Sequence, residues 1–251
     1  NALLTLLDQP SATLADLPRL FADEKFRKEA VERIVHPPVR DFWLQEFKSY
    51  SPWMKAEALG PLRNKLGAFL SQPLLYRILT KEKSDFDLRR VIDEGGVLLV
   101  NLSKGRMGAD ASSLLGALLV TRISLAALAR ADVSEEERRP FFVYLDEFQN
   151  MTTLTVASML SELRKYGVGM ILAHQYLGQL EEEVREAIMG NVGTIMLFRI
   201  GPEDAHLLGK YFRPEFEEDD LLNLPNHSLY VRLMVDGATT RPFSADTIPP
   251  P

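Results

Sequence analysis

The 251-residue sequence contains no cysteine, which excludes disulfide bonds and thiolate metal sites. It also contains no Gly-x-x-x-x-Gly-Lys-Ser/Thr motif, the loop whose backbone cradles nucleotide phosphates. Neither a signal peptide nor an internal repeat is recognisable. The content of 46% hydrophobic and 25% charged residues is that of an ordinary globular chain with ample core. Because the chain begins at Asn1 without a methionine, we expect a fragment of a longer protein, with room upstream for a membrane anchor.

The net charge of −6 argues against a surface that coats nucleic acid. The charge is uneven, since residues 1–90 carry 15 basic and 12 acidic side chains, whereas residues 91–251 carry 14 and 23. If DNA is bound, we therefore expect the contact to come from a local loop or from the N-terminal third.

Residues 1–83 show helical periodicity without a β-rich run, so we expect an all-helical subdomain there. We expect Trp43 and Trp53 to lie in its core. The apolar stretch from Ala111 to Ala129 is long enough to suggest a membrane span. It contains Arg122 and several hydroxyl residues, so we expect a core helix that is buried on several sides.

Residues 84–251 change in character, because short apolar runs alternate there with helical segments. This alternation predicts an α/β domain with a mainly parallel sheet flanked by helices. The expected strands are Val97–Leu102, the run that starts at Phe141, Met170–His174 and Thr194–Ile200, and a helix is expected over Leu154–Leu163. Asp236-Gly237, between Ser228–Val235 and Ala238–Ser244, predicts a C-terminal β-hairpin.

The run from Phe141 to Asn150 is the most informative stretch of the chain. It predicts a strand buried on both faces that ends at Asp146 and Glu147. A buried strand that stops at two carboxylates is typical of a Walker B element. Asp146 would hold Mg²⁺ and Glu147 would polarise the water that attacks the γ-phosphate of ATP. The alternative is a strand that ends in an acidic turn without catalytic function.

Two further polar features follow expected strands, namely His174-Gln175 and the loop Ser103–Asp110. Strand ends on one edge of a parallel sheet converge on one crevice, so Gln175 could sense the γ-phosphate beside the acid pair. We assign no catalytic role to His174. Arg164 ends the helix before the strand that carries Gln175. It either compensates the helix dipole or reaches a nucleotide phosphate.

Arg199 is a second candidate for phosphate binding, and a buried ion pair is its alternative. Gly105 and Gly108 lack the spacing and the lysine of a phosphate-binding loop. Without such a loop we expect this chain to bind ATP poorly. Either the loop lies upstream of Asn1 or the site is degenerate.

The ordered set of these segments resembles the conjugative coupling ATPases of type IV secretion, the TraG/TraD kind, within the HerA/FtsK superfamily of RecA-like hexameric motors. The resemblance rests on Val97–Gly105, Val143–Asn150, Leu163–Gly167, Ile171–Gln175, Phe198–Ala205 and the Phe243-Ser segment. It spans roughly residues 84–250, and the match of residues 1–83 is weaker. The missing phosphate-binding loop is the departure from the family pattern.

The resemblance implies a RecA-like core at residues 84–251 and an ATP-driven DNA or nucleoprotein translocase that works as a homo-oligomeric ring with ATP and Mg²⁺. It implies Walker B roles for Asp146 and Glu147, a sensor role for Gln175 and a place near the nucleotide for Arg164. It also implies contact with secretion-system or relaxosome proteins and a cytoplasmic location at the face of the inner membrane. A HerA-like DNA-processing motor and a non-catalytic docking module with a degenerate site remain as alternatives.

Overall fold

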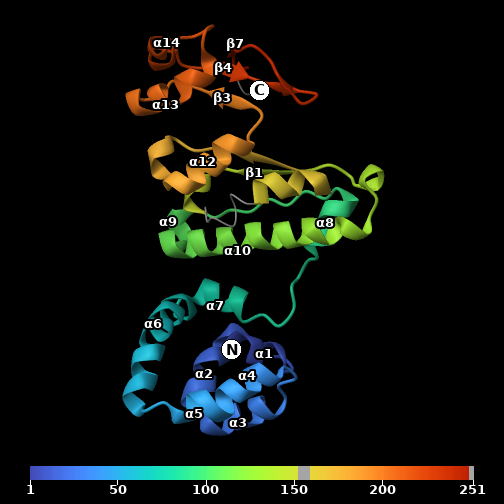
Figure 1. The fold of residues 1–251 in the computed structure, drawn as a ribbon, viewed down its shortest axis with the longest axis vertical. Coiled ribbons are helices and arrows are strands. Elements are labelled where there is room, and N and C mark those ends of the chain that lie inside the picture. The colour runs from blue at the N-terminus through green and yellow to red at the C-terminus, as the bar shows by residue number, and fades with distance from the viewer. Residues whose placement is uncertain (152–158, 249–251) are drawn as a thin grey trace. The chain divides into compact units, whose positions relative to one another are not determined.

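The computed structural model describes residues 1–151 and 159–248 (Figure 1). The chain divides into two compact units. Unit 1 comprises Asn1–Asp87 and Lys104–Ala111, and unit 2 comprises Leu88–Ser103 and Ser112–Pro251.

All the described secondary-structure elements of unit 1 are helices or helical turns. Its α-helices are α1 (Ala2–Leu7), α2 (Leu17–Ala22), α3 (Glu24–Glu32), α4 (Pro37–Asp41), α5 (Phe47–Ser49), α6 (Pro52–Leu70), α7 (Pro73–Leu79) and α9 (Lys104–Met107), with a 3₁₀ turn η1 (Leu14–Asp16) and a π-turn η2 (Phe42–Glu46). Prolines occupy the first turn of α2, α4, α6 and α7, where a missing backbone N–H costs nothing.

The core of unit 1 is built around aromatic rings. Trp43 and Phe47 are buried and meet edge to face, with 5.0 Å between ring centroids. The indole Nε1 of Trp43 donates a 2.7 Å hydrogen bond to the buried hydroxyl of Thr5. The prediction that Trp43 is a core residue is confirmed, whereas Trp53 is 70% exposed and its placement in the core was wrong.

Unit 2 contains most of α10 and all seven strands of the described chain. Its α-helices are α8 (Leu88–Glu94), α10 (Ala109–Leu128, whose first residues belong to unit 1), α12 (Glu182–Asn191), α13 (Pro202–Phe212) and α14 (Glu218–Leu222). Its 3₁₀ turns are η3 (Ala129–Asp132), η4 (Glu135–Glu137), η5 (Phe148–Asn150), η6 (Leu163–Tyr166) and η7 (Leu177–Gln179). The strands are β1 (Phe141–Leu145), β2 (Val168–Leu172), β3 (Ile195–Leu197), β4 (Ser228–Arg232), β5 (Met234–Val235), β6 (Ala238–Thr239) and β7 (Phe243–Asp246).

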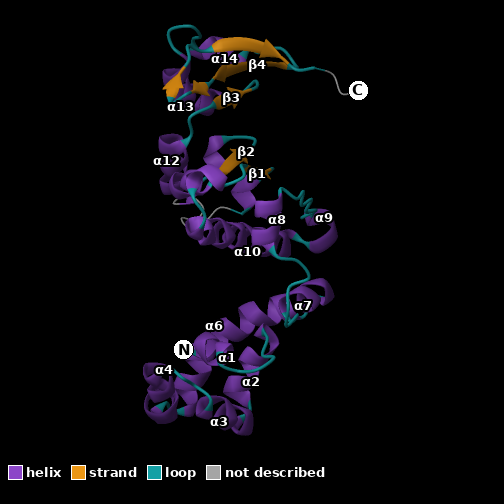
Figure 2. Ribbon diagram, turned by 90° about the vertical axis from the view of Figure 1, so that its right-hand side faces the viewer, coloured by secondary structure: helices purple, strands orange, loops and turns teal. Residues whose placement is uncertain are grey.

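The strands of unit 2 form three small sheets (Figure 2). β1 and β2 are parallel, and their register pairs Phe141 with Val168 and Leu145 with Leu172. β3, β4 and β7 form an antiparallel sheet in that order. β5 and β6 are joined by Asp236 and Gly237, both with positive φ, which confirms the predicted hairpin turn.

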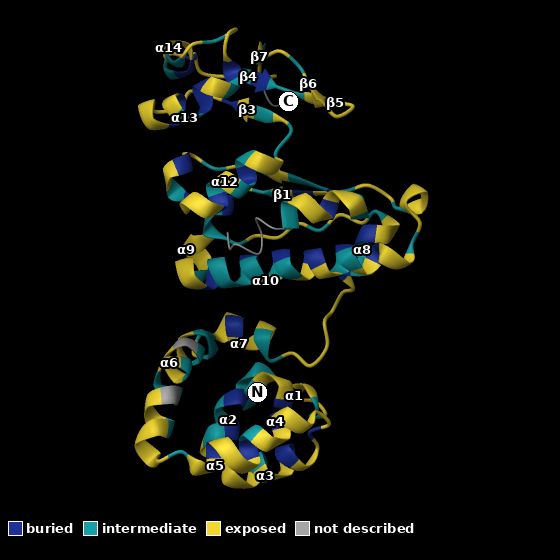
Figure 3. Cartoon of the chain, in the orientation of Figure 1, coloured by how far each residue is buried: buried dark blue, intermediate teal, exposed yellow. Residues whose placement is uncertain are grey.

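One face of the β1–β2 pair is buried and the other is exposed (Figure 3). Val143 and Val168 pack with Ile123 and Ala127 of α10 in one core cluster. On the opposite face Phe142 is 59% and Tyr144 is 74% exposed. The prediction that this strand is buried on both faces was therefore wrong.

Two other sequence-based expectations also fail in the described residues. Val97–Leu102 forms no strand, and Val97 and Leu99 are 87% and 90% exposed. A strand requires a paired neighbour, and no described residue pairs with this run. β3 lies antiparallel beside β4 and does not extend the parallel pair. Part of the helix expected over Leu154–Leu163 falls on residues 152–158, outside the described residues.

The long helix α10 is buried along one side only. Ile123 and Ala127 are buried, whereas Leu118 and Leu125 are 41% and 61% exposed, so burial on several sides was wrong. By length and composition alone the segment Ala109–Asp132 could cross a membrane, a test that core helices also pass.

Candidate nucleotide-hydrolysis site

The carboxyl ends of β1 and β2 lie side by side and carry the predicted polar groups. The backbone ladder continues past both strands, because Ala173 N–H donates to Leu145 O at 2.9 Å and Phe148 N–H donates to Ala173 O at 3.1 Å. Glu147 is the second residue after β1, and Gln175 is the third residue after β2. The parallel pairing therefore brings both residues to one edge, as the sequence predicted.

The carboxylate of Glu147 is held in place by two amides. Gln175 Nε2 donates to Glu147 Oε1 at 2.9 Å, and Gln149 Nε2 donates to Oε2 at 2.7 Å. The backbone of Glu147 has φ 50° and ψ 42°, a left-handed conformation that residues other than glycine rarely adopt. Strained backbone of this kind persists where the surrounding structure holds it, and it is common at functional sites.

Asp146 is exposed beside this pair. Its Oδ1 accepts a 3.0 Å hydrogen bond from the backbone N–H of Glu147, and its carboxylate remains accessible. In the described residues no three His, Cys, Asp or Glu side chains converge on a metal site. Mg²⁺ in nucleotide sites is commonly held by one or two carboxylates together with phosphates and water, and the single carboxylate of Asp146 fits that use.

Two rings, those of Phe148 and His174, pack next to Glu147 and Gln175 at this edge of the strand pair. Phe148 is 1% exposed and belongs to a core cluster with residues of α12 and α13. The imidazole of His174 meets Phe148 edge to face at 5.0 Å. Burial lowers the pKa of His174 below its ordinary value of 6.5, although the negative charges of Asp204 and Glu147 act in the opposite direction. The ring of His174 therefore packs against the core through Phe148.

Asp204 is a site residue that sequence reasoning missed. It lies in the first turn of α13, is 5% exposed, and accepts from the backbone N–H of Leu177 at 3.0 and 3.2 Å. It thereby fastens the segment that follows Gln175. Acidic residues are common in the first turn of a helix, so its residue type carried no distinguishing signal. Gln149 was missed for a similar reason, because it is one of several polar residues after the strand.

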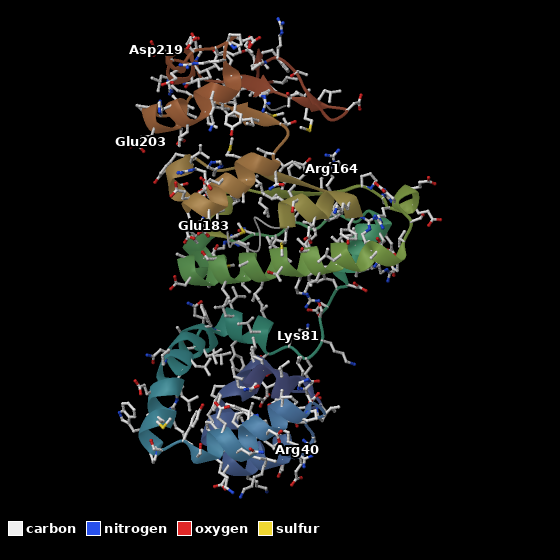
Figure 4. The ribbon with its side chains drawn as sticks, in the orientation of Figure 1. Arg40, Lys81, Arg164, Glu183, Glu203 and Asp219 are labelled. Atoms are coloured by element: carbon white, nitrogen blue, oxygen red, sulfur yellow. The ribbon has the colours of Figure 1, made fainter. Side chains whose placement is uncertain are left out.

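Arg164 does not join Glu147 within this chain. Arg164 (Figure 4) lies in η6 at the amino end of β2. Glu147 follows the carboxyl end of β1. Five residues of parallel strand separate the two edges, roughly 16 Å. Arg164 instead lines a cavity of about 590 Å³ together with Asn191, Thr194 and Asp236.

Arg199 forms no hydrogen bond or ion pair with Asp146 or Glu147. Arg199 is exposed, and its Nη2 donates to Asn226 Oδ1 at 3.4 Å, so the buried ion pair is also not found. In the predicted loop Ser103–Asp110, residues 104–107 form α9, and residues 104–110 belong to unit 1. Two of the three expected strand ends therefore share one edge in unit 2.

Comparison with known proteins places the chain in a family. Residues 63–212 match the family model described as the type IV secretion-system coupling protein DNA-binding domain. No curated protein shows significant similarity to the chain.

Two solved structures are similar in fold. The bacterial conjugative coupling protein TrwBdeltaN70, in an unbound monoclinic form, is 16% identical with a TM-score of 0.67, covering 98% of this chain and 61% of that chain. The plasmid coupling protein TrwB in complex with ADP and Mg²⁺ is 17% identical with a TM-score of 0.62, covering 98% of this chain and 66% of that chain. The chain thus spans less than two thirds of either structure.

These likenesses confirm the predicted RecA-like α/β fold with a helical N-terminal region. The family model covers more than half of the chain, from the middle of α6 to the end of α13. The chain therefore belongs to the family of type IV secretion-system coupling proteins, the TraG/TraD kind.

Proposed function

We propose that this chain is the Walker B half of an ATP-driven translocase that moves DNA or nucleoprotein during conjugation. The observation that carries the proposal is the 2.9 Å hydrogen bond from Gln175 to Glu147 at the shared edge of β1 and β2. An amide on the carboxylate that activates water is suited to report the state of the γ-phosphate. The solved TrwB complex with ADP and Mg²⁺ supports nucleotide and magnesium as ligands.

The proposed roles divide among three side chains. Asp146 would hold Mg²⁺, which neutralises charge on the β- and γ-phosphates when it is bound. Glu147 would accept a proton from the attacking water, and Gln175 and Gln149 would keep its carboxylate oriented. Arg199 remains a proposed phosphate contact, which rests on its residue type within Phe198-Arg-Ile alone.

A phosphate-binding loop is needed to complete this site, and we propose that another segment of the full protein supplies it. The exposed apolar face of the parallel pair favours this view. Phe142, Tyr144 and Ile171 are 59%, 74% and 40% exposed on one face, whereas parallel sheets are normally covered on both. Further chain packed on that face would bury these side chains and could bring the missing loop to the edge.

The position of Arg164 favours a ring. Since Arg164 lies roughly 16 Å from the acid pair of its own chain, we propose that it acts on the nucleotide of a neighbouring copy. Its guanidinium has no hydrogen bond or ion pair with any described residue, so it is free to meet a phosphate. Contacts with DNA, with secretion or relaxosome proteins and with the cytoplasmic face of the inner membrane belong to the same proposal.

The test is ATP hydrolysis by the protein encoded by the complete reading frame. Glu147→Gln should retain bound ATP and reduce turnover by roughly 10²–10⁴-fold, because a general base is lost. Glu183→Gln, an exposed glutamate on α12, is the matched control and should leave turnover unchanged (Figure 4). Full turnover by the Glu147 variant would remove this residue from the mechanism.

A second candidate is a docking module whose nucleotide site is degenerate. The missing phosphate-binding loop in these 251 residues favours it. If the complete protein binds its secretion partners but neither binds nor hydrolyses ATP, this candidate replaces the first.

A further inference from the structure

The turn that carries Arg164 is held by arginine side chains from outside it. Arg130 is 1% exposed in η3, which directly follows α10, and its Nη1 donates to Tyr166 O at 2.7 Å. Arg138 Nη1 donates to Lys165 O, the next carbonyl along the turn. Two consecutive carbonyls directly after Arg164 are thus bound by guanidinium groups.

The rest of the turn is fixed by backbone bonds. Gly167 N–H donates to Arg164 O at 3.1 Å, and Gly167 O accepts from Phe141 N–H of β1 at 2.9 Å. Gly167 has φ 73°, and a Cβ added there would lie 3.3 Å from Arg130 Nη1. Every carbonyl from Arg164 to Gly167 therefore has a partner, while the Arg164 side chain itself remains exposed.

The two holding arginines are in turn fixed by neighbours. Arg130 Nε lies 3.0 Å from Asp93 Oδ1 of α8, and Arg130 Nη2 donates to Arg139 O at 2.8 Å. The Arg138 guanidinium lies over the ring of Tyr166, 5.3 Å from its centroid, and Arg138 Nε donates to Val133 O at 3.0 Å.

The burial of Arg130 is not explained by a gain in folding stability. Burying a charge costs free energy even when it is paired, and an apolar side chain often replaces a buried ion pair without loss. Unlike leucine or methionine, Arg130 has a planar guanidinium group whose N–H donors point in fixed directions. Such donors hold backbone carbonyls at defined positions.

We infer that Arg130 and Arg138 are positioning residues that set the direction of Arg164 toward a neighbouring copy's nucleotide. The inference rests on the proposed role of Arg164 and adds the residues through which the fold serves it. A displacement of about 1 Å at such a group can cost about 10²-fold in rate.

A double-mutant cycle on kcat tests this in the complete, assembled protein. Arg164→Ala alone should lower kcat by up to about 10³–10⁵-fold. Arg130→Met alone should lower kcat by about 10²-fold with the KM for ATP unchanged. In the Arg164→Ala background, Arg130→Met should lower kcat no further, because its only route to the reaction has been removed.

Two more variants separate positioning from stability. Arg138→Met, which removes the Lys165 carbonyl bond from a half-buried side chain, should show the same dependence on Arg164 with less risk of misfolding. Val143→Ala destabilises the core cluster that contains Leu163 but removes no hydrogen bond to the turn, and it should lower Tm while kcat is kept.

The outcomes are distinct. Additive losses for the Arg130 and Arg164 variants overturn the positioning role, and so does an equal kcat loss in Val143→Ala. Full turnover by Arg164→Ala also overturns it, because nothing is left to position. If Glu147→Gln still reduces turnover by roughly 10²–10⁴-fold in that case, the proposed function itself stands.

Discussion

Asp204 provides the sharpest test of how the site edge is held. Both carboxylate oxygens accept from one buried donor, the N–H of Leu177, at 3.0 and 3.2 Å. Asp204→Ala leaves that N–H without a partner in the core. A lost hydrogen bond to a charged group typically costs about 1.5–3 kcal/mol. Loss of the favourable helix-dipole interaction adds about 0.3–1 kcal/mol.

Glu203 is the matched control for this prediction. It precedes Asp204 in the same first turn of α13, but it is exposed and makes no hydrogen bond or ion pair with a described residue (Figure 4). Glu203→Ala should lower the free energy of unfolding only by the helix-dipole contribution, about 0.3–1 kcal/mol. Asp204→Asn, which keeps one acceptor oxygen and loses the charge, should fall between the two.

The assay is urea denaturation followed by far-UV circular dichroism, with a thermal scan beside it. For 150–250 residues, 1 kcal/mol corresponds to about 2–4 °C in Tm, so Asp204→Ala should lower Tm by about 4–16 °C. Tryptophan emission reports separately on unit 1, because Trp43 and Trp53 both lie there. Measurement at pH 8 keeps His174, whose pKa burial lowers, neutral throughout.

Amide exchange gives a local readout for the same variant. The N–H of Leu177 should lose protection in Asp204→Ala and keep it in Glu203→Ala. Equal costs for the two alanine variants would refute the reasoning, because Asp204 would then act only on the helix dipole.

Two further predictions concern single buried groups. Thr5→Val leaves the indole N–H of Trp43 without its acceptor, so unit 1 should lose about 1–3 kcal/mol of unfolding free energy in a urea titration followed by tryptophan emission, and an unchanged midpoint would contradict this. The pKa of His174 in the folded protein lies below its ordinary value of 6.5. When pH falls below 6.5, the unfolded chain therefore binds more protons at this residue than the folded chain does. Stability should therefore be complete above pH 6.5 and decrease below it, which thermal scans from pH 8 to 5 can measure. The decrease should be smaller in His174→Asn, whereas the control His36→Asn, at an exposed residue, should keep the full decrease.

Some features of the site followed from local pattern alone. An apolar β-rich run that ends at Asp146 and Glu147, and a second run that ends before Gln175, were enough to predict two parallel strands with their polar groups at one edge. Helical spacing separated by prolines predicted the helical character of unit 1, and Asp236-Gly237 predicted the hairpin turn. These are short-range properties, because chain periodicity and turn chemistry act over a few residues.

The sequence pattern gave wrong predictions of strand formation and burial where these depend on residues far away in the chain. Val97–Leu102 has the composition of a strand, but strand formation also requires a neighbour that supplies hydrogen bonds. Phe142 and Tyr144 are apolar enough for a covered face, yet their exposure depends on what packs against them.

The sequence by itself determined the residue types at the carboxyl ends of β1 and β2, and with them the chemistry that the edge can perform. Only the tertiary structure decided that Arg164 lies at the opposite edge, that Asp204 holds Leu177, and that Arg130 and Arg138 hold the turn after Arg164. The physical reason is distance along the chain. Each of these contacts joins residues 27 or 36 positions apart, so it exists only after the elements have packed.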